Sequence, residues 1–397
     1  MPMTRNKEFY DLLAIGLRDY SYTDLKSYLD DMFAEKYNAD SFYDNLGFPL
    51  NPNIPIRPTY EQIEVTVRPY TMATHVDIDS DGPTKSTDGM ALSMGQIPIW
   101  KHEFTIGRKE LREQMYLADR IGRVTPEIVD VAMEQMFITA DKLLGGNYNT
   151  MAYNRHQIVS NGGKLIINAQ NSHLGIPLSL DFGVPSKNFT TKQWFTKNAT
   201  TGDITEKSGI TPIKDMKEIR KNARRKDNMP SAGHWEVSDT TWEDALSLEY
   251  FRKQYALAKR PDIESDANRL AWAETIPDAD IKAYIEEQIG APIVVVDHIG
   301  FVEKFDPKTK KMEYIECPSF KEGVFVYVPD GAIGDTQFGK PIYMETPGAR
   351  NALYDGGRTL IRQVFNDENM IQTIKSEFTG LPVPNQTRWM YYLTVQG

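Results

Sequence analysis

The sequence predicts an α+β protein with at least two cores. Helical periodicity predominates at 210–290, whereas apolar and polar side chains alternate as in β-strands within 62–106, and further strand-like segments follow between 293 and 328. The chain has 397 residues, and a typical domain has about 150. Hydrophobic residues at 40% and charged residues at 25% are typical of folded globular proteins. We therefore expect packed domains rather than a disordered chain.

The charge and cysteine content exclude several classes of protein. Lys and Arg total 45 against 55 Asp and Glu, and the net charge of −10 argues against tight binding to nucleic acid or an anionic membrane. Cys317 is the only cysteine, which excludes an intrachain disulfide and cysteine-rich zinc sites. The longest aliphatic run, Ile293–Val296, is too short to span a membrane, and the first residues lack a secretory signal. We expect a cytoplasmic protein stabilised by packing or assembly.

Residues 1–60 are interpreted as an N-terminal arm. Four prolines between Phe48 and Pro58 break any helix and predict an extended strap. Before this strap, apolar residues recur with helical spacing and predict two amphipathic helices that need a surface to pack on; these residues are Phe9, Leu12, Leu13 and Leu17, then Leu25, Tyr28, Leu29, Met32 and Phe33.

Residues 61–106 are predicted to form an extended hairpin loop. Apolar residues alternate from Ile63 to Val67 and again from Trp100 to Ile106, around a polar, glycine-containing tip at 77–89. A two-stranded hairpin is marginally stable alone in water, so it should rest on another domain or subunit.

A helix is predicted to begin at Thr125-Pro126-Glu127 and to end at Gly145-Gly146. A second helical stretch at 151–158 stops before Gly162-Gly163. Further along the chain, helices are expected at 213–226, 241–258 and 278–290, and strands at 164–168, 293–296, 300–305, 312–315 and 324–328.

An acidic motif in the hairpin tip has the spacing of a calcium-binding loop. Asp77, Asp79 and Asp81 precede Gly82, and Asp88 occupies the twelfth position. The last ligand is not Glu and the flanking segments are strand-like rather than helical, so a solvated hairpin tip is the favoured interpretation.

Other candidate catalytic residues are isolated. Ser93 lies in Ala91–Gly95, which resembles a nucleophile elbow, but strand periodicity favours a serine in the returning strand. No two of the six histidines have a metal-binding spacing, and Asp297-His298 is retained only as a general-base candidate. The basic stretch 213–226 carries a core-facing stripe, which favours a solvated or subunit-facing helix over nucleic-acid binding. No catalytic residue and no cofactor is predicted.

From about residue 60 to its end, the sequence resembles the tailed-bacteriophage major capsid proteins of the lambda head-protein type, the major capsid protein E family. The resemblance rests on the order and spacing of short blocks: Met72-Ala-Thr-His-Val76, Ile97-Pro-Ile99, Ile106-Gly-Arg-Lys-Glu-Leu111, Gly162-Gly-Lys164, Leu180-Asp-Phe-Gly-Val-Pro185 with Trp194, Ile213-Lys-Asp-Met216, Thr241-Trp-Glu-Asp-Ala245, Val326-Tyr-Val-Pro-Asp-Gly331, Pro382-Val-Pro384 and Leu393-Thr-Val395.

This resemblance implies the Hong Kong 97-like (HK97-like) capsid fold. The N-terminal arm would be 1–60 and the extended loop 61–106. A peripheral domain would comprise 107–208 and 345–397, with a spine helix at about 125–160, and an axial domain would comprise 209–344. The protein would then be a non-enzymatic virion subunit.

The resemblance also implies partners. The subunit would form hexamers and pentamers of an icosahedral head around double-stranded DNA, together with portal, scaffold and decoration proteins, and would assemble in the host bacterial cytoplasm. Two alternatives stay open from the residues alone: a metal-dependent hydrolase using Asp77, Asp79 and Asp81, and another virion subunit such as a tail-tube protein.

Overall fold

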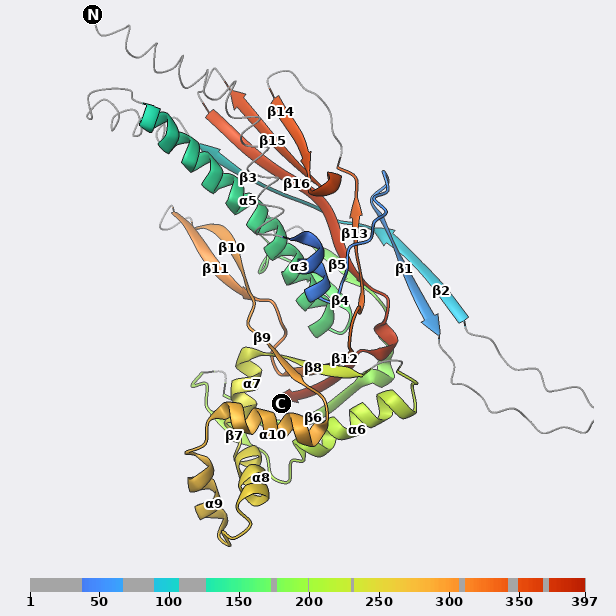
Figure 1. Ribbon diagram of the computed structural model, residues 1–397, viewed down its shortest axis with the longest axis vertical. Coiled ribbons are helices and arrows are strands. Elements are labelled where there is room, and N and C mark those ends of the chain that lie inside the picture. Colours follow the sequence, from blue (N-terminus) through green and yellow to red (C-terminus); the bar gives the residue numbers. More distant parts are fainter. Residues whose placement is uncertain are drawn as a thin grey trace, which may run out of the picture. The chain divides into compact units, whose positions relative to one another are not determined.

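The computed structural model describes residues 38–66, 89–106, 126–172, 177–198, 200–229, 232–306, 311–341, 349–366 and 371–396. They divide into two compact units, which are drawn together in Figure 1. Unit 1 draws on Met1–Glu61, Met94–Met151 and Asp335–Val383, and unit 2 on Gln62–Ser93, Ala152–Gly334 and Pro384–Gly397. Helices and strands are mixed in both units, so the predicted α+β class is confirmed.

Unit 1 is built on an antiparallel sheet. The strand β16 (Ile371–Pro384) pairs with β15 (Thr359–Asn366) on one side and with β3 (Ile99–Ile106) on the other. The sheet is completed by β14 (Ala349–Tyr354) beside β15 and by β13 (Gly334–Gly339) beside β16. The C-terminal strands of this sheet were not predicted from the sequence.

An aromatic cluster forms the core of unit 1. The helix α3 (Ala39–Asn45) contributes Tyr43, whose ring lies edge-on to Phe338 of β13 with centroids 5.9 Å apart. Tyr148 and Phe378 are buried in the same cluster. The described end of the arm is therefore packed against its own chain.

The proline-containing strap lies along β13, with an isolated parallel bridge between Leu50 and Thr336. The backbone N–H of Thr336 donates to the carbonyl of Pro49, and the N–H of Asn51 donates to the carbonyl of Thr336. The Thr336 hydroxyl also donates to the carbonyl of Phe48 at 2.7 Å. These bonds satisfy strap and strand groups that neither segment could satisfy alone. The two predicted arm helices lie outside the described residues.

The helix α5 runs without interruption from Pro126 to Ser160. The prediction that Gly145-Gly146 ends a first helix is wrong. Gly146 has a packing role instead, because a Cβ atom there would lie 2.6 Å from Cε1 of His102 in β3. A glycine inside a helix costs about 1 kcal/mol relative to alanine, and here the missing side chain leaves room for the histidine ring.

The predicted hairpin has a different second strand. The ribbon pairs β1 (Thr59–Thr66) with β2 (Gly89–Gln96). The strand predicted at 100–106 is β3, and it joins the sheet of unit 1 rather than the ribbon. Gly95 lies against the ring of Tyr60, where a Cβ atom would be 2.5 Å from Cε1. The polar tip at 77–88 lies outside the described residues.

Unit 2 is built on a mixed six-stranded sheet. Its central strand β12 (Val324–Pro329) is antiparallel to β17 (Tyr391–Gln396) and to β8 (Gly233–Ser238). Outside these, β6 (Phe189–Lys197) is parallel to β17 and β9 (Ile293–Val296) is parallel to β8, and β7 (Ile204–Glu206) closes one edge. Every residue of β12 is buried, as its uninterrupted apolar sequence indicates.

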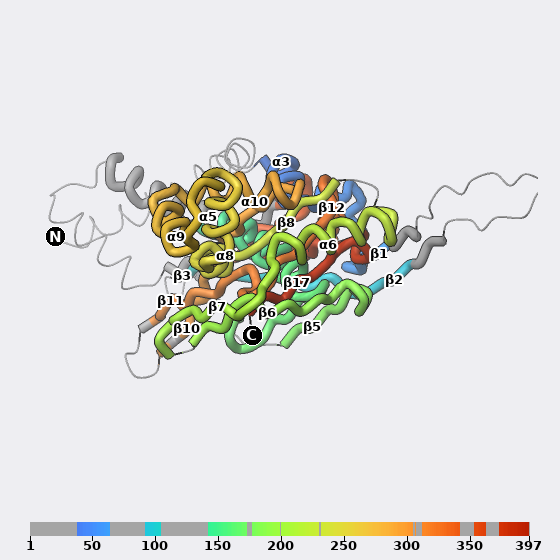
Figure 2. The backbone as a smooth tube through the Cα atoms, turned by 90° about the horizontal axis from the view of Figure 1, so that it is seen from below, coloured from blue at the N-terminus to red at the C-terminus, as the bar shows by residue number. Residues whose placement is uncertain are grey.

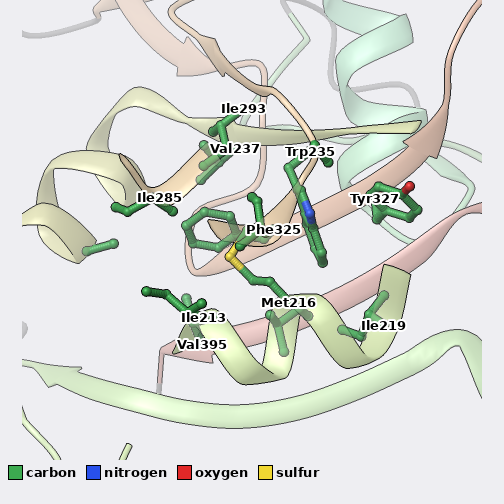
Figure 3. Close-up of a cluster of buried hydrophobic side chains, with 14 of the residues drawn as sticks. Ile213, Met216, Ile219, Trp235, Val237, Ile285, Ile293, Phe325, Tyr327 and Val395 are labelled. Atoms are coloured by element: carbon green, nitrogen blue, oxygen red, sulfur yellow. The ribbon is translucent and has the colours of Figure 1, made fainter. Parts of the chain in front are cut away.

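Helices cover this sheet and complete the main core (Figure 3). The helix α6 (Pro212–Arg225) buries Ile213, Met216, Ile219 and Ala223, which is the stripe predicted from its spacing. The helix α10 (Asp278–Ile289) buries isoleucines and ends at Gly290, which has the left-handed conformation of a C-cap. The single helix predicted over 241–258 is divided into α7 (Asp239–Leu246) and α8 (Glu249–Lys259), and α9 (Asp266–Ala273) follows.

Two hairpins complete unit 2. The longer joins β10 (Ile299–Asp306) to β11 (Lys311–Pro318), both at predicted strands, and the shorter joins β4 (Lys164–Ile167) to β5 (Leu178–Asp181). Short 3-10 helices occupy Ser186–Asn188, Asp355–Gly357 and Thr387–Trp389. Among the described segments, no helix combines the length and apolar character needed to cross a membrane.

The sheet of unit 2 combines strands from distant parts of the sequence. The strands β6 and β17, which lie in 107–208 and 345–397, pair in one sheet with β12 and β8, which lie in 209–344. The tube drawing in Figure 2 follows these strands.

Candidate assembly surfaces

The ribbon exposes apolar side chains on its described strands. Leu92 and Met94 are two residues apart on β2, so they lie on the same face, and they are 60% and 63% exposed. Ile63 on β1 is also exposed. Ser93 lies between Leu92 and Met94 within β2, a strand position as predicted, and its side chain is exposed. Exposed apolar residues on a two-stranded ribbon are typical of a surface that another chain covers.

The hairpin of β10 and β11 has a second apolar surface. The register places Phe301 opposite Glu316 and Glu303 opposite Tyr314, so these four side chains share one face. Phe301 is 56% exposed and Tyr314 70% exposed. Ile299 and Met312 are exposed on the same face. We call this face the outer hairpin face.

The opposite face of the hairpin is anchored to unit 2. Gly300 lies against the ring of Tyr153, where a Cβ atom would be 2.9 Å from Cδ2. Lys304 donates to the carbonyl of Ala169, and the Sγ of Cys317 lies 3.6 Å from the carbonyl oxygen of Gln170. Burial raises the pKa of the Cys317 thiol, which disfavours the reactive thiolate. One face is thus fixed while the outer hairpin face stays open.

A buried ion pair lies where α5 enters unit 2. The guanidinium of Arg155 donates to both carboxylate oxygens of Glu236 in β8. His234 contacts the same carboxylate at 3.2 Å and Asp330 at 2.8 Å. Burial alone would raise the pKa of Glu236, but Arg155 and His234 hold that pKa well below its usual value. The carboxylate stays ionised, and both of its oxygens already accept hydrogen bonds from Arg155. This arrangement is typical of a structural role.

Histidine and serine side chains meet beside this pair, but they are not arranged as a catalytic nucleophile and base. Ser319 is completely buried; its hydroxyl donates to the carbonyl of His298 at 2.6 Å and lies 3.2 Å from Nδ1 of His156. Burial and the adjacent Arg155 lower the pKa of His156 to about 3. Such a weak base, beside a hydroxyl that is already donating, does not form an accessible nucleophile.

The predicted general-base candidate does not gain support from its surroundings. Burial lowers the pKa of His298, whereas an effective general base has a pKa near the working pH. Its ring instead packs against that of His156, with centroids 5.2 Å apart. This contact could not be predicted from the sequence, because His156 and His298 are 142 positions apart and belong to different structural elements.

The metal candidates Asp77, Asp79, Asp81 and Asp88 lie outside the described residues, as do His75 and His173. Within the described ranges, no group of three or more His, Cys, Asp or Glu residues is placed to hold a metal ion.

A small groove lies where α5 ends. Its volume is about 260 Å³, and its lining includes Lys164, Lys321, Phe189 and Tyr392. The Phe189 and Tyr392 rings are stacked with centroids 4.8 Å apart, and Lys164 pairs with Asp181 at 3.0 Å. Typical small-molecule sites enclose about 300 to 1,000 Å³, so this groove is small for a substrate pocket.

Comparisons with known proteins give distant structural likenesses. No family model and no curated protein matches the sequence. A solved structure described as a prophage capsid protein, from Escherichia coli CFT073, is 14% identical, with a TM-score of 0.48 over 94% of this chain and 98% of that one. A phage-related protein from Bordetella bronchiseptica RB50 is 12% identical, with a TM-score of 0.40 over 91% and 93%. The capsid of the cyanophage P-SCSP1u is 8% identical, with a TM-score of 0.39 over 88% and 86%.

Proposed function

We propose that this chain is a phage major capsid protein, a structural subunit that assembles into the shell of a virion. The observation that carries the proposal is the ribbon, whose apolar residues Leu92 and Met94 are exposed on a structure that is marginal by itself. A capsid subunit meets copies of itself on several sides, so surfaces of this kind are covered in the shell.

The outer hairpin face supports the same function. Phe301 and Tyr314 are exposed on this face, and the opposite face of the hairpin packs on unit 2. The strands that carry the two aromatic residues are therefore positioned before a partner binds. Aromatic residues on a pre-organised surface are favourable contact points, because little conformational freedom is lost on binding.

The order of structural features supports the HK97-like fold. The described part of the arm, 38–58, precedes the ribbon of β1 and β2, and the long helix α5 follows at Pro126–Ser160, near the spine helix expected at about 125–160. We assign 107–208 and 345–397 to a peripheral domain and 209–344 to an axial domain, with β6 and β17 joining them through the sheet of unit 2. The lambda-type assignment is part of this proposal and rests on the sequence blocks.

The proposed partners follow from the proposed function. Copies of the chain form hexamers and pentamers of an icosahedral head that encloses double-stranded DNA without reading its sequence. Portal, scaffold and decoration proteins complete the particle, which assembles in the host bacterial cytoplasm. The net charge of −10 is compatible with a shell that does not adhere strongly to packed DNA.

Negative-stain microscopy of the expressed full chain tests the function. Closed shells or hexameric capsomers are the expected particles. Helical tubes would favour a tail-tube protein, and a persistent monomer that retains a bound metal would favour a hydrolase; either result overturns the proposal.

A substitution pair tests the contribution of the ribbon. Leu92→Ser combined with Met94→Ser removes apolar area from the ribbon, and Ser93→Ala on the intervening position is the matched control. We expect the double variant to remain folded but to assemble poorly, and the control to assemble like the wild type. Equal assembly of all three proteins would contradict a role of the ribbon in contacts between subunits.

A further inference from the structure

The helix α6 presents a strongly basic face to solvent. Its apolar stripe is buried and its one buried acid, Asp215, accepts a hydrogen bond from Trp194 Nε1 at 3.1 Å, so that acid is turned inward. The exposed side of the helix and its C-cap carry Lys214, Lys217, Lys221, Arg224, Arg225 and Lys226, with Glu218 as the exposed acid of this helix. We call these six cations the basic face.

The helix dipole accounts for only part of the basic face. Arg224 and Arg225 lie in the last turn, where cations stabilise the partial negative charge of the helix C-terminus. Lys214 lies in the first turn, where a cation is unfavourable, and Lys221 lies in the middle of the helix. Among the described residues, neither Lys221 nor Arg224 has an ion-pair partner.

The same unit carries an exposed acidic surface around α9 and the start of α10. Glu264 precedes α9, Glu274 is its C-cap residue and Asp280 lies in the first turn of α10. Further exposed acids of this surface are Asp262, Asp266 and Asp278. We call these six residues the acidic surface.

Pairing within the chain neutralises only half of the acidic surface. Arg260 pairs with Asp262, Arg269 with Asp266, and Arg252 with Asp278. Within the part of the chain that the structure describes, no cation pairs with Glu264, Glu274 or Asp280. A negative charge at the C-cap of α9 is also unfavourable for its helix dipole, so helix stability does not explain Glu274.

The two surfaces lie on different sides of unit 2. Figure 1 shows α6 and α9 at opposite sides of the unit, with α10 between them, and the view in Figure 2 agrees. Two complementary surfaces on opposite sides of one compact unit cannot neutralise each other within that unit. They can do so between successive copies.

We propose that the basic face of one copy docks on the acidic surface of the next copy, so that identical subunits join head to tail. This inference rests on the proposed function and names the partner and the residues of one contact. A head-to-tail contact between different surfaces closes into a ring when the rotation between copies permits, as in a hexamer or pentamer.

The physical contribution of this contact is orientation and rate. Complementary charges speed encounter and disfavour wrong pairings more than they add affinity. Screening is strong for exposed charges, because the Debye length falls from about 10 Å at 0.1 M salt to about 3 Å at 1 M. Capsomer formation should therefore be slower at high salt, while apolar contacts of the ribbon and hairpin are less affected.

Double-stranded DNA is the other polyanion that could meet the basic face. The observations favour a second copy, because DNA gives no reason for the unpaired Glu264, Glu274 and Asp280 on the other side of the unit. A DNA-binding role therefore serves as one outcome of the test.

Charge reversal of each surface tests the contact in the full-length chain. The first variant carries Lys221→Glu and Arg224→Glu, and the second carries Glu264→Lys and Glu274→Lys. The control variant carries Asp203→Lys and Glu322→Lys, which are exposed positions of unit 2 outside both surfaces. Assembly is followed by light scattering and negative-stain microscopy, and folding by circular dichroism.

We expect each reversed variant alone to assemble at least about tenfold more slowly than wild type, with the control unaffected. Mixing the two reversed variants should restore assembly, because each supplies the charge that the other needs. A variant with all four reversals should also assemble.

Four results would overturn the proposal. If the wild type assembles and both reversed variants assemble at the same rate as the wild type, the head-to-tail contact does not exist, but the proposed capsid function is unaffected. If the first variant assembles normally but loses retention on DNA, the basic face binds nucleic acid instead. If mixing and the four-reversal variant both fail to restore assembly of folded proteins, the two surfaces do not meet. A wild-type chain that stays monomeric overturns the capsid function together with this contact.

Discussion

The guanidinium of Arg155 makes a bidentate ion pair with the carboxylate of Glu236, with N to O distances of 2.5 and 2.6 Å. The two side chains are only 7% and 2% exposed. The pair links the C-terminal part of α5 to the central sheet of unit 2. A buried pair of this kind gives orientation, because each charge can be accommodated only when the other is in place.

Breaking the Arg155–Glu236 pair from one side should be costly. We expect Arg155→Met to lower the free energy of unfolding by about 3 to 5 kcal/mol, since Glu236 is left buried and without its main counter-charge. The double variant Arg155→Met with Glu236→Leu should be more stable than Arg155→Met alone. Urea unfolding followed by circular dichroism measures both.

An exposed ion pair provides the control for that experiment. Lys253 and Glu249 are paired at 2.6 Å on α8, with side chains 37% and 55% exposed. Lys253→Met should change stability by less than about 1 kcal/mol. If Arg155→Met were as mild as Lys253→Met, the buried pair would have no special role in this fold.

Acid should destabilise unit 2 through His156. Its pKa is about 3 in the folded chain, against an ordinary value of 6.5, because burial and Arg155 disfavour the protonated ring. Well above pH 6.5 the ring is neutral in both the folded and the unfolded chain. As the pH falls from 6.5 towards 3, the unfolded chain binds the proton first, so stability declines by up to about 1.4 kcal/mol per pH unit.

The variant His156→Asn isolates this effect. Its amide can still contact the Ser319 hydroxyl but does not titrate, so the stability of the variant should depend less on pH between 6.5 and 4. The opposite contribution of His234 is present in both proteins: its carboxylate partners raise its pKa in spite of burial, and that stabilisation is lost as the pH rises. Equal pH slopes for wild type and variant in urea unfolding would contradict the assignment to His156.

Local patterns predicted much of unit 2. Apolar spacing was sufficient to identify the buried stripe of α6. The glycine at position 290 predicted the end of α10, and in the structure it is the C-cap residue with a left-handed conformation. Pairing between distant strands was harder, because alternation reveals a strand but not its neighbour. The strand at 100–106 was recognised, yet its partner is β16, more than 260 positions later.

The candidate surfaces were only partly predictable. A hairpin in need of support was expected, but exposure of Leu92 and Met94 depends on which strand pairs with β1. The contact between His102 and Gly146 accounts for a glycine at position 146 inside α5, and nothing in the local sequence signals that the histidine approaches there. The charge asymmetry of unit 2 was visible as a basic stretch, whereas its acidic counterpart emerged from the arrangement of α9 and α10.

Alanine at position 146 should destabilise unit 1, although alanine favours helices. The helix gains about 1 kcal/mol, but the new Cβ would lie 2.6 Å from Cε1 of His102, a ring held by Asn147 at 2.7 Å. Overpacking of this kind costs about 1 to 3 kcal/mol, so we expect a net loss measured by thermal or urea unfolding. In a His102→Ser background the same Gly146→Ala change should be neutral or stabilising, and loss of stability in both backgrounds would show that the ring is not the obstacle.

The outer hairpin face should matter for assembly more than for folding. Phe301 and Tyr314 are 56% and 70% exposed, so replacing both by serine removes little buried area from the isolated subunit. We expect the unfolding midpoint of Phe301→Ser with Tyr314→Ser to stay close to that of wild type while the yield of shells or capsomers falls severalfold. Glu313→Ser, at an exposed position on the other face of the same hairpin, is the matched control. Light scattering and sedimentation distinguish the outcomes: wild-type assembly by the aromatic variant would mean that this face stays exposed in the particle, because a covered aromatic surface cannot be lost without weakening the contact.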